Sequence, residues 1–556
     1  MNGNNNPPHT PDRLLIPAMI RIGVTGHRVL PDEATIRISI QQVIDTITNQ
    51  LPHTPCKFTI LSPLAEGADR IVASEFERLN SNNQEIGYNI SSSLISVLPL
   101  PKDDYMQDFK TPSSKEIFEK FLQSAEKTIV LNLDDTNETP KEHRRAAYEQ
   151  VGQYIVHNCD ILIAIWNGKK AAGRGGTEEI FRYAETNGRT CAWIHSETGA
   201  ITWYRREDDT FASLENLDQF NTEKIKTDAL EKGIEKRFSH LTACAGEAGL
   251  PSGFLDPLHR DLLPLYGKAS YLAKKYRNFH TYCGISVYVL AAFAVIIVTT
   301  QVLFFSDNPY LILPEILVII AIIILVQLSN NCEWHRKWLD YRFLAERLRA
   351  MSFLSVLCTP AKQPSEPTYL SHRPKDWVVM AHDGIQSKNP NVYCSITLDD
   401  SLFESVKTFI LKAWIDEQIT FYSNKEKHLR GRNQELMLFC GGIFFITFIA
   451  AFFHFFGHFL IPTQTNGPLL TLFAALAISL PAVGSSVTAI RNYREYQRNS
   501  ERYGSMVQYL TTIRNEINRA TTREKFIELV KEADEVMMKE HMDWRILFTC
   551  RSIEVL

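Results

Sequence analysis

The sequence lacks an excess of charge of either sign. It contains 59 Lys and Arg against 63 Asp and Glu in 556 residues, which gives a formal net charge of −4. Binding to nucleic acid depends on a surplus of basic side chains, so we expect no nucleic-acid partner. A chain of this length exceeds a single hydrophobic core and predicts two or three folded units.

The sequence also lacks any clustering of cysteine. Its ten cysteines are scattered, with no C-x-x-C pair and no histidine at the spacing of a zinc site. We therefore expect reduced thiols, no metal and no resident cofactor. The first 20 residues are rich in Asn and Pro and contain no long apolar run. They predict a disordered tail over residues 1–17 and no cleaved signal peptide.

Long apolar runs are abundant in the second half of the chain. Residues 281–305 carry no charged side chain, and residues 310–328 carry one, Glu315. Each run is long enough to cross the ~30 Å hydrocarbon core as a helix. Residues 436–461 and 469–490 form a second such pair. The length and adjacency of the runs favour two membrane hairpins over hairpins buried in a soluble protein.

Basic residues flank the outer ends of both hairpins, whereas the two joining loops have none. By the positive-inside rule, both termini and the segment between the hairpins are predicted to be cytosolic. We expect a multi-pass protein of the inner (plasma) membrane.

A sequence repeat follows each hairpin. A pattern of basic, aromatic, acidic and small residues begins at Arg336 and again at Arg491, 155 residues later, with no gap. We interpret it as a tandem duplication without inversion, because two spans return the chain to the same side. Chance similarity between two amphipathic helices is the alternative.

Residues 18–200 alternate between apolar strands and helical patterns. The strands read as unbroken apolar runs, which is typical of a parallel sheet covered by helices on both faces. The fold class is therefore an α/β Rossmann-like domain followed by an all-α membrane domain with four transmembrane helices. The expected division is a tail (1–17), the Rossmann-like domain (18–200), a helical linker (201–280), hairpin 1 (281–328), a cytosolic helical segment (329–434), hairpin 2 (435–490) and C-terminal helices (491–556).

Charged residues and glycines follow the predicted strands. Ligands of open α/β sheets bind at the carboxyl ends of the strands, so these loops are expected to share one crevice. Arg28 is a candidate for a phosphate or carboxylate, and Asp69 or Glu66 for ribose hydroxyls. The alternatives are solvated loop residues and, for Asp69, a helix N-cap. The candidates in these two loops are Thr25, Gly26, His27, Arg28, Glu66, Gly67 and Asp69.

A glycine-rich segment, residues 167–179, connects a predicted strand to a helix. Glycines allow the backbone to approach a phosphate, and a helix N-terminus offers N–H groups to an anion. A glycine-rich turn without a ligand is the alternative. The candidates here are Gly173, Gly175, Gly176, Thr177, Glu178 and Glu179.

The order of the motifs Thr-Gly-His-Arg, Gly-Ala-Asp-Arg, Cys-Asp-Ile-Leu-Ile-Ala-Ile-Trp-Asn-Gly and Gly-Gly-Thr-Glu-Glu resembles the SLOG superfamily. The membrane half resembles SLATT modules, which are effectors in bacterial nucleotide-signalling conflict systems. The resemblance implies a cytosolic domain that senses a nucleotide-derived or ADP-ribose-like ligand. It also implies a homo-oligomeric channel or pore, or a membrane-disrupting effector, in antiviral defence.

Phosphoribohydrolases of that superfamily carry Pro-Gly-Gly-x-Gly-Thr-x-x-Glu. Here no proline precedes the glycines, and the glutamates stand one and two positions after Thr177 instead of three. We therefore favour the ligand-gated effector. The alternative is a membrane-tethered nucleotide hydrolase or phosphoribohydrolase, with Glu179 as the acid and Arg28 as the phosphate anchor. A transporter is a weaker third possibility, since the spans lack paired charges.

Few polar side chains lie within the predicted spans. Such groups line passages or pack helix against helix. The pore candidates are Glu315, His454, Ser485 and Ser486.

Overall fold

The computed structural model describes residues 12–86, 90–131, 140–170, 175–205, 210–359, 376–387, 400–460 and 467–549. The chain forms two compact units. We call the first the α/β domain (Met1–Lys224 and Lys362–Asn389) and the second the helical unit (Ile225–Ala361 and Pro390–Leu556). Gly173 lies outside the described residues.

The α/β domain is built on a seven-stranded sheet in the order β4-β3-β2-β1-β5-β6-β7. All neighbouring strands are parallel except β6 and β7, which are antiparallel. This confirms the predicted Rossmann-like α/β fold. The strands are β1 (Ala18–Gly26), β2 (Cys56–Ser62), β3 (Ile90–Leu98), β4 (Lys127–Val130), β5 (Ile161–Trp166), β6 (Thr190–His195) and β7 (Ile201–Tyr204).

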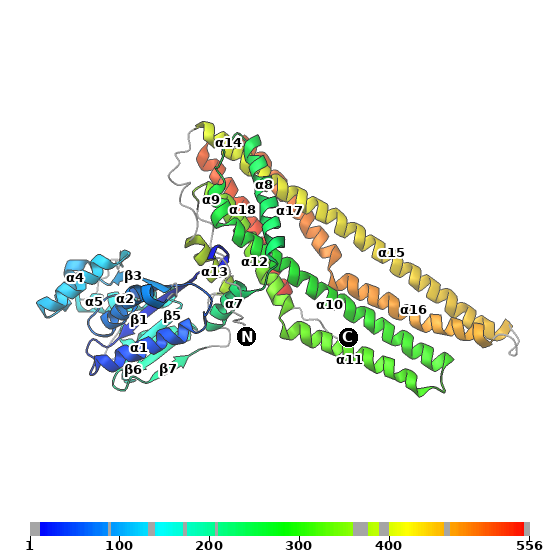
Figure 1. Ribbon diagram of the computed structural model, residues 1–556, viewed down its shortest axis with the longest axis horizontal. Helices are drawn as coiled ribbons and strands as arrows, with labels where there is room; N and C mark the ends of the chain where they lie inside the picture. Colours follow the sequence, from blue (N-terminus) through cyan, green and yellow to red (C-terminus); the bar gives the residue numbers. More distant parts are fainter. Residues whose placement is uncertain are drawn as a thin grey trace, which may run out of the picture. The chain divides into compact units, whose positions relative to one another are not determined.

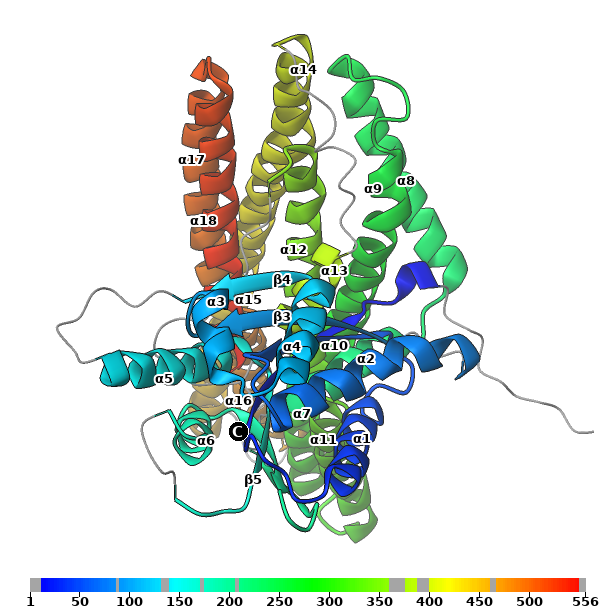
Figure 2. The ribbon, with the colours of Figure 1, turned by 90° about the vertical axis from the view of Figure 1, so that its left-hand side faces the viewer.

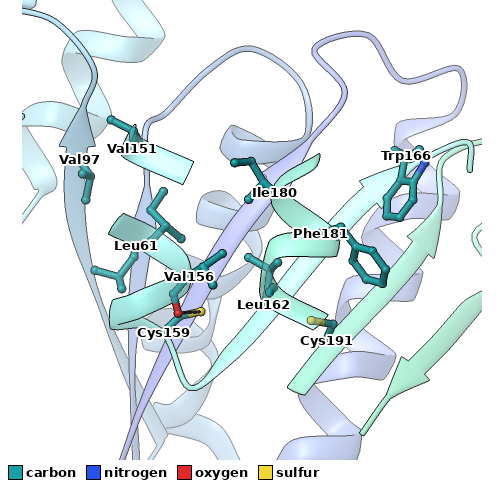
Figure 3. Close-up of a cluster of buried hydrophobic side chains, with 13 residues drawn as sticks. Leu61, Val97, Val151, Val156, Cys159, Leu162, Trp166, Ile180, Phe181 and Cys191 are labelled. Atoms are coloured by element: carbon teal, nitrogen blue, oxygen red, sulfur yellow. Dashed lines mark hydrogen bonds between the residues drawn. The ribbon is translucent and has the colours of Figure 1, made fainter. Parts of the chain in front are cut away.

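Helices cover both faces of the sheet (Figure 1). On one face, α5 and α6 pack over the buried strand β5 and form an apolar cluster that includes Val151, Leu162 and Phe181 (Figure 3). On the other face, Phe76 of α2 stacks edge-on against Phe58 of β2, with ring centroids 5.1 Å apart. The helices are α1 (Glu33–Thr48), α2 (Ala68–Ile86), α3 (Lys102–Tyr105), α4 (Pro112–Ser124), α5 (Pro140–Asn158) and α6 (Thr177–Thr186), with 3-10 turns at Asp12–Leu14 and Met106–Asp108.

The α/β domain extends beyond the residues 18–200 that the sequence indicates. Strand β7 and helix α7 (Thr210–Thr222) continue it, although residues 201–280 read as a helical linker. It also includes α13 (Trp377–Ser387), from the segment between the hairpins. A Cβ on Gly384 of α13 would overlap the Pro17 carbonyl oxygen, so the glycine permits close packing beside β1.

Four helices of the helical unit are long and apolar enough to cross a membrane. They are α10 (Leu263–Phe304), α11 (Ile312–Asn331), α15 (Glu417–Leu460) and α16 (Gly467–Tyr493), and each matches one predicted span to within two residues at the ends of the span that it covers. The predicted pair of hairpins is confirmed. Helices α10 and α15 begin well before their apolar runs. The first span of each hairpin is therefore continuous with a polar helical extension.

The rest of the helical unit consists of helices packed beside these extensions (Figure 2). Helix α18 lies against both α12 and α17. The elements are α8 (Thr227–Glu247), α9 (Asp256–Asp261), α12 (Trp334–Val356), α14 (Asp400–Ile410), α17 (Tyr496–Arg519) and α18 (Arg523–Thr549), with a 3-10 turn at Pro309–Leu311 and a π-helical turn at Leu411–Asp416.

Each hairpin is followed by the same helix break. Glu333 before α12 and Glu495 before α17 both have left-handed backbone angles (φ 51° and 47°), and each pairs with the arginine three residues further on. The breaks are 162 residues apart (495 − 333), whereas the sequence match has an offset of 155. The difference of seven residues is two helical turns, which keeps side chains on nearly the same face.

Candidate functional site

The strand order of the α/β domain reverses direction between β1 and β5. Strands β2 to β4 extend from one side of β1, and β5 to β7 from the other. The His27 N–H donates to the Ile165 carbonyl oxygen at 2.9 Å, so the loop after β1 starts beside the end of β5. Ligands of open α/β sheets bind at such a switch point.

The loops after β1 and β2 meet at Gly67. This glycine has φ 78°, and a Cβ there would overlap the carbonyl oxygens of His27 and Arg28. The Ala68 N–H donates to the His27 carbonyl oxygen at 3.1 Å. Gly26 is equally confined, because its Cβ would overlap that of Ala68. The structure therefore brings together the two loops that contain the candidates from Thr25 to Asp69.

Asp69 is buried at the start of α2, where its Oδ2 accepts the Ala65 N–H at 3.1 Å. It closes the turn before the helix. Burial raises the pKa of Asp69 to about 7, although the Ala65 N–H and the nearby positive charges of Arg28 and Arg70 act in the opposite direction. Burial also lowers the pKa of His27. The site therefore contains a carboxyl group that changes charge near neutral pH.

Arg70 fixes the neighbouring loop to helix α4. Its Nε donates to the Leu64 carbonyl oxygen at 3.0 Å, and its Nη1 donates to the Ser114 hydroxyl at 2.8 Å. The Ser114 hydroxyl donates in turn to the Glu66 carboxylate. The Arg70 Nη2 is buried without a hydrogen-bond partner. Arg70 belongs to the Gly-Ala-Asp-Arg motif but was not among the sequence candidates.

Arg28 is the more exposed arginine of the site, with 43% of its side chain accessible. Its guanidinium lies 3.9 Å from the Asp108 carboxylate and 5.7 Å from the centroid of the Tyr148 ring. Asp108 also pairs with Arg144 at 2.8 Å and accepts the Tyr148 hydroxyl. Asp108, Arg144 and Tyr148 gave no sequence signal, because Asp108 lies 36 residues before Arg144 and 40 before Tyr148 and meets them only in the fold.

Within the glycine-rich segment, residues 167–170 and 175–179 are described, and Gly175 has φ 79°. A Cβ on Gly175 would lie 2.9 Å from the Glu149 nitrogen and 3.3 Å from the Tyr148 carbonyl carbon, so the loop rests on α5. Gly176 is the N-cap of α6 and Thr177 its first residue. The Tyr148 region of α5 therefore adjoins both the glycine-rich segment and Arg28.

Each of the two glutamates after Thr177 has a partner close to it in the sequence. Glu179 accepts the N–H of Gly175, the residue before the Gly176 N-cap, at 2.7 Å. Glu178 pairs with Arg182 at 2.6 Å, one turn further on. This arrangement matches capping of the α6 N-terminus.

The pore candidates lie on three helices. Glu315 is in the first turn of α11 and His454 is on α15, and both are half-buried. On α16, Ser485 is exposed and Ser486 is half-buried. Whether these side chains line a passage stays a prediction.

The comparisons with known families divide the helical unit at the predicted duplication. Residues 411–544 match the family described as "SMODS and SLOG-associating 2TM effector domain 1". Residues 268–359 match a family described as a protein of unknown function (DUF4231). No curated protein matches the chain.

The C-terminal part of the chain thus matches the model of SLATT two-helix effector domains over residues 411–544, in agreement with the predicted resemblance. The parallel sheet of the α/β domain is compatible with a Rossmann-like SLOG domain. With its four apolar helices, the chain is a membrane protein.

We expect the stability of the α/β domain to fall as pH rises from about 4 to 7. The folded chain holds the Asp69 proton up to about pH 7, whereas an unfolded aspartate releases it near 3.8. The folded state therefore binds more protons in this window, and the loss approaches ~4 kcal/mol at an ordinary 1.36 kcal/mol per pKa unit. Hydrogen exchange of α2 amides, corrected for intrinsic rates, measures it. Asp69→Asn should remove this pH dependence, and an unchanged slope would refute the assignment.

Proposed function

We propose that the chain is a membrane effector whose α/β domain senses an anionic, nucleotide-derived ligand in the cytosol of a bacterial cell and whose spans then make the inner membrane permeable. The observation that carries this proposal is the combination of two parts in one chain. Arg28 lies in the loop after β1, beside the topological switch point of the α/β sheet, and a region that matches a two-helix effector family follows in the same chain.

The site favours a ligand that carries phosphate. Arg28 is accessible, and its partner Asp108 is 3.9 Å away and shared with Arg144, so an anion can compete for the guanidinium. The N-terminus of α6 provides a second group suited to a phosphate, because its N–H groups and helix dipole attract anions. Protonation of Asp69 below about pH 7 strengthens the attraction by removing a nearby negative charge.

Ligand binding opens the membrane only if the ligand binds the conducting arrangement more tightly than the closed one. The loops that join the two spans of each hairpin are short, so little of the chain lies on the non-cytosolic side of the membrane to perform another function. The antiviral role that the resemblance to SLATT effectors implies is part of the proposal.

The test is leakage of dye or ions from liposomes that contain the full chain, measured with a panel of nucleotides at pH 6.5. Arg28→Ala should reduce the apparent affinity for the active nucleotide at least tenfold, because a charge-assisted contact contributes about 1.5–3 kcal/mol. Arg78→Ala is the matched control, since Arg78 lies on α2, is 65% exposed and pairs with Glu75. A nucleotide that binds without causing any leak, or a leak indifferent to Arg28→Ala, would refute the proposal.

The hydrolase alternative gains no specific support from the site. It needs Glu179 as an acid, and the Glu179 carboxylate accepts the Gly175 N–H as a helix cap. Release of a base from a nucleoside monophosphate, abolished by Glu179→Ala in the detergent-solubilised chain, would favour that alternative.

A further inference from the structure

The four apolar helices form a row. Helix α10 packs against α11 on one side and α16 on the other, and α16 packs in turn against α15. Figure 1 shows them in the order α11, α10, α16, α15. The helices at the ends of the row, α11 and α15, make no comparable contact with each other within the described residues.

The row alternates between equivalent helices of the two hairpins. In hairpin 1, the Cys283 Sγ donates to the Leu325 carbonyl oxygen at 3.4 Å, and in hairpin 2 the Cys440 Sγ donates to that of Gly484 at 3.8 Å. In chain order, α10 and α15 are the first helices of their hairpins, and α11 and α16 are the second helices. The two cysteine contacts join the first helix to the second at corresponding places in the two hairpins. The order of the row is therefore second, first, second, first.

The contact between the hairpins joins the first helix of one to the second helix of the other. The Tyr493 hydroxyl, at the end of α16, donates to the His280 carbonyl oxygen of α10 at 3.1 Å, and Arg494 donates to the Thr281 hydroxyl at 2.7 Å. A Cβ on Gly284 would overlap the Tyr493 ring, so α16 approaches α10 where the side chain is smallest.

The equivalent glycine on α15 has no such neighbour. Gly284 follows Cys283, and in hairpin 2 Gly441 and Gly442 follow Cys440. A Cβ on either Gly441 or Gly442 would meet no atom within 4 Å. Gly441 shares its helix face with Phe445 and Phe448, which are 65% and 67% exposed. Interior glycine weakens a helix, whereas small residues permit close helix packing in membranes.

We propose that the Gly441 face of α15 packs against α11 of a second copy of this chain. This contact repeats the one between α10 and α16, because it again joins a first helix to a second helix. Leu317 and Ile324 of α11 are 64% and 56% exposed and offer an apolar surface to it. A contact that joins two different faces propagates from copy to copy and closes into a ring when the rotation permits.

This inference does not depend on the proposed ligand, because it concerns the helical unit alone. The sequence predicted a homo-oligomer without naming its interface. The inference assigns that interface to α15 of one copy and α11 of the next. Crosslinking can therefore succeed or fail independently of leakage, and the two proposals are tested separately.

The experiment places photoreactive benzoylphenylalanine at Phe448 of the full chain in membranes. Light and heavy copies are produced separately, mixed in detergent and reconstituted together, so that crosslinked peptides that carry both labels show that two chains are joined. The expected adduct joins Phe448 to a peptide of α11 from another copy. Phe453 is the matched control, because it stacks on Phe473 of α16 with centroids 5.6 Å apart and should crosslink within one chain.

Gly441→Leu should reduce the α15 to α11 adduct at least tenfold, since the larger side chain separates the helices. Gly431→Leu should leave it unchanged, because Gly431 also has open space around it but precedes the apolar run. An adduct between two α15 helices, which indicates a symmetric contact, would overturn the proposal. So would recovery of adducts with lipid alone while the Phe453 control succeeds.

Discussion

Replacing Arg347 by methionine is expected to destabilise the helical unit by about 3–5 kcal/mol, because it leaves a buried charge without its partner. Arg347 on α12 and Asp534 on α18 form two hydrogen bonds, at 2.9 and 3.2 Å. Their side chains are only 3% and 4% exposed. The pair attaches α18, which follows hairpin 2, to α12, which follows hairpin 1.

The measurement is hydrogen exchange of α18 amides in the detergent-solubilised chain. Arg347→Met should increase their exchange by two orders of magnitude or more, provided that α18 detaches as a unit. Arg347→Met combined with Asp534→Leu should recover most of the protection, since an apolar pair carries no desolvated charge. Lys525→Met on the same helix is the control, because Lys525 is 54% exposed and its ion pair with Glu528 contributes little. Equal exchange in the single and double variants would contradict this account.

The local patterns of the sequence were sufficient for the main architecture. Apolar runs determine where helices can cross a membrane, and unbroken apolar strands require a sheet covered on both sides. Strand β7 escaped notice because Ile201–Tyr204 is short and pairs antiparallel at the edge of the sheet. Helix α13 was assigned to the segment between the hairpins, because its packing beside β1 is a tertiary contact with no local signal.

The predicted duplication also combines a feature that the local sequence pattern shows with one that it does not. The repeated sequence pattern has an offset of 155, but the left-handed residues Glu333 and Glu495 place the corresponding helix breaks 162 apart. Glutamate does not favour this backbone conformation, so composition does not predict the breaks. A shift of seven residues is about two helical turns and keeps the same side chains on the packed face. The offset of the sequence match can therefore differ from the offset of the helix breaks without changing the packing.

At the candidate site, the sequence located the loops but not their connections. The rule that ligand-binding loops follow parallel strands was enough to select Arg28 and Asp69. The residues around Arg28 could not be predicted from the sequence, because Asp108 and Tyr148 contact it from other elements of the fold. Whether these residues bind a ligand stays a prediction.

Replacing Gly67 by alanine is expected to destabilise the α/β domain by about 3–5 kcal/mol. The φ of 78° costs an L-residue about 1–2 kcal/mol. The new methyl group would also overlap two backbone carbonyl oxygens, those of His27 and Arg28, and backbone cannot move aside as a flexible side chain can. The loop that carries Arg28 would have to leave the start of α2. Hydrogen exchange of β1 and α2 peptides measures the loss.

Gly168→Ala separates the two causes, because Gly168 has a similar φ of 75° while its nearest obstacle is the Trp193 side chain at 3.2 Å. It should cost only the backbone term, about 1–2 kcal/mol. If both variants lose the same protection, the overlap at Gly67 contributes nothing, and the contact between the β1 and β2 loops is looser than the structure indicates.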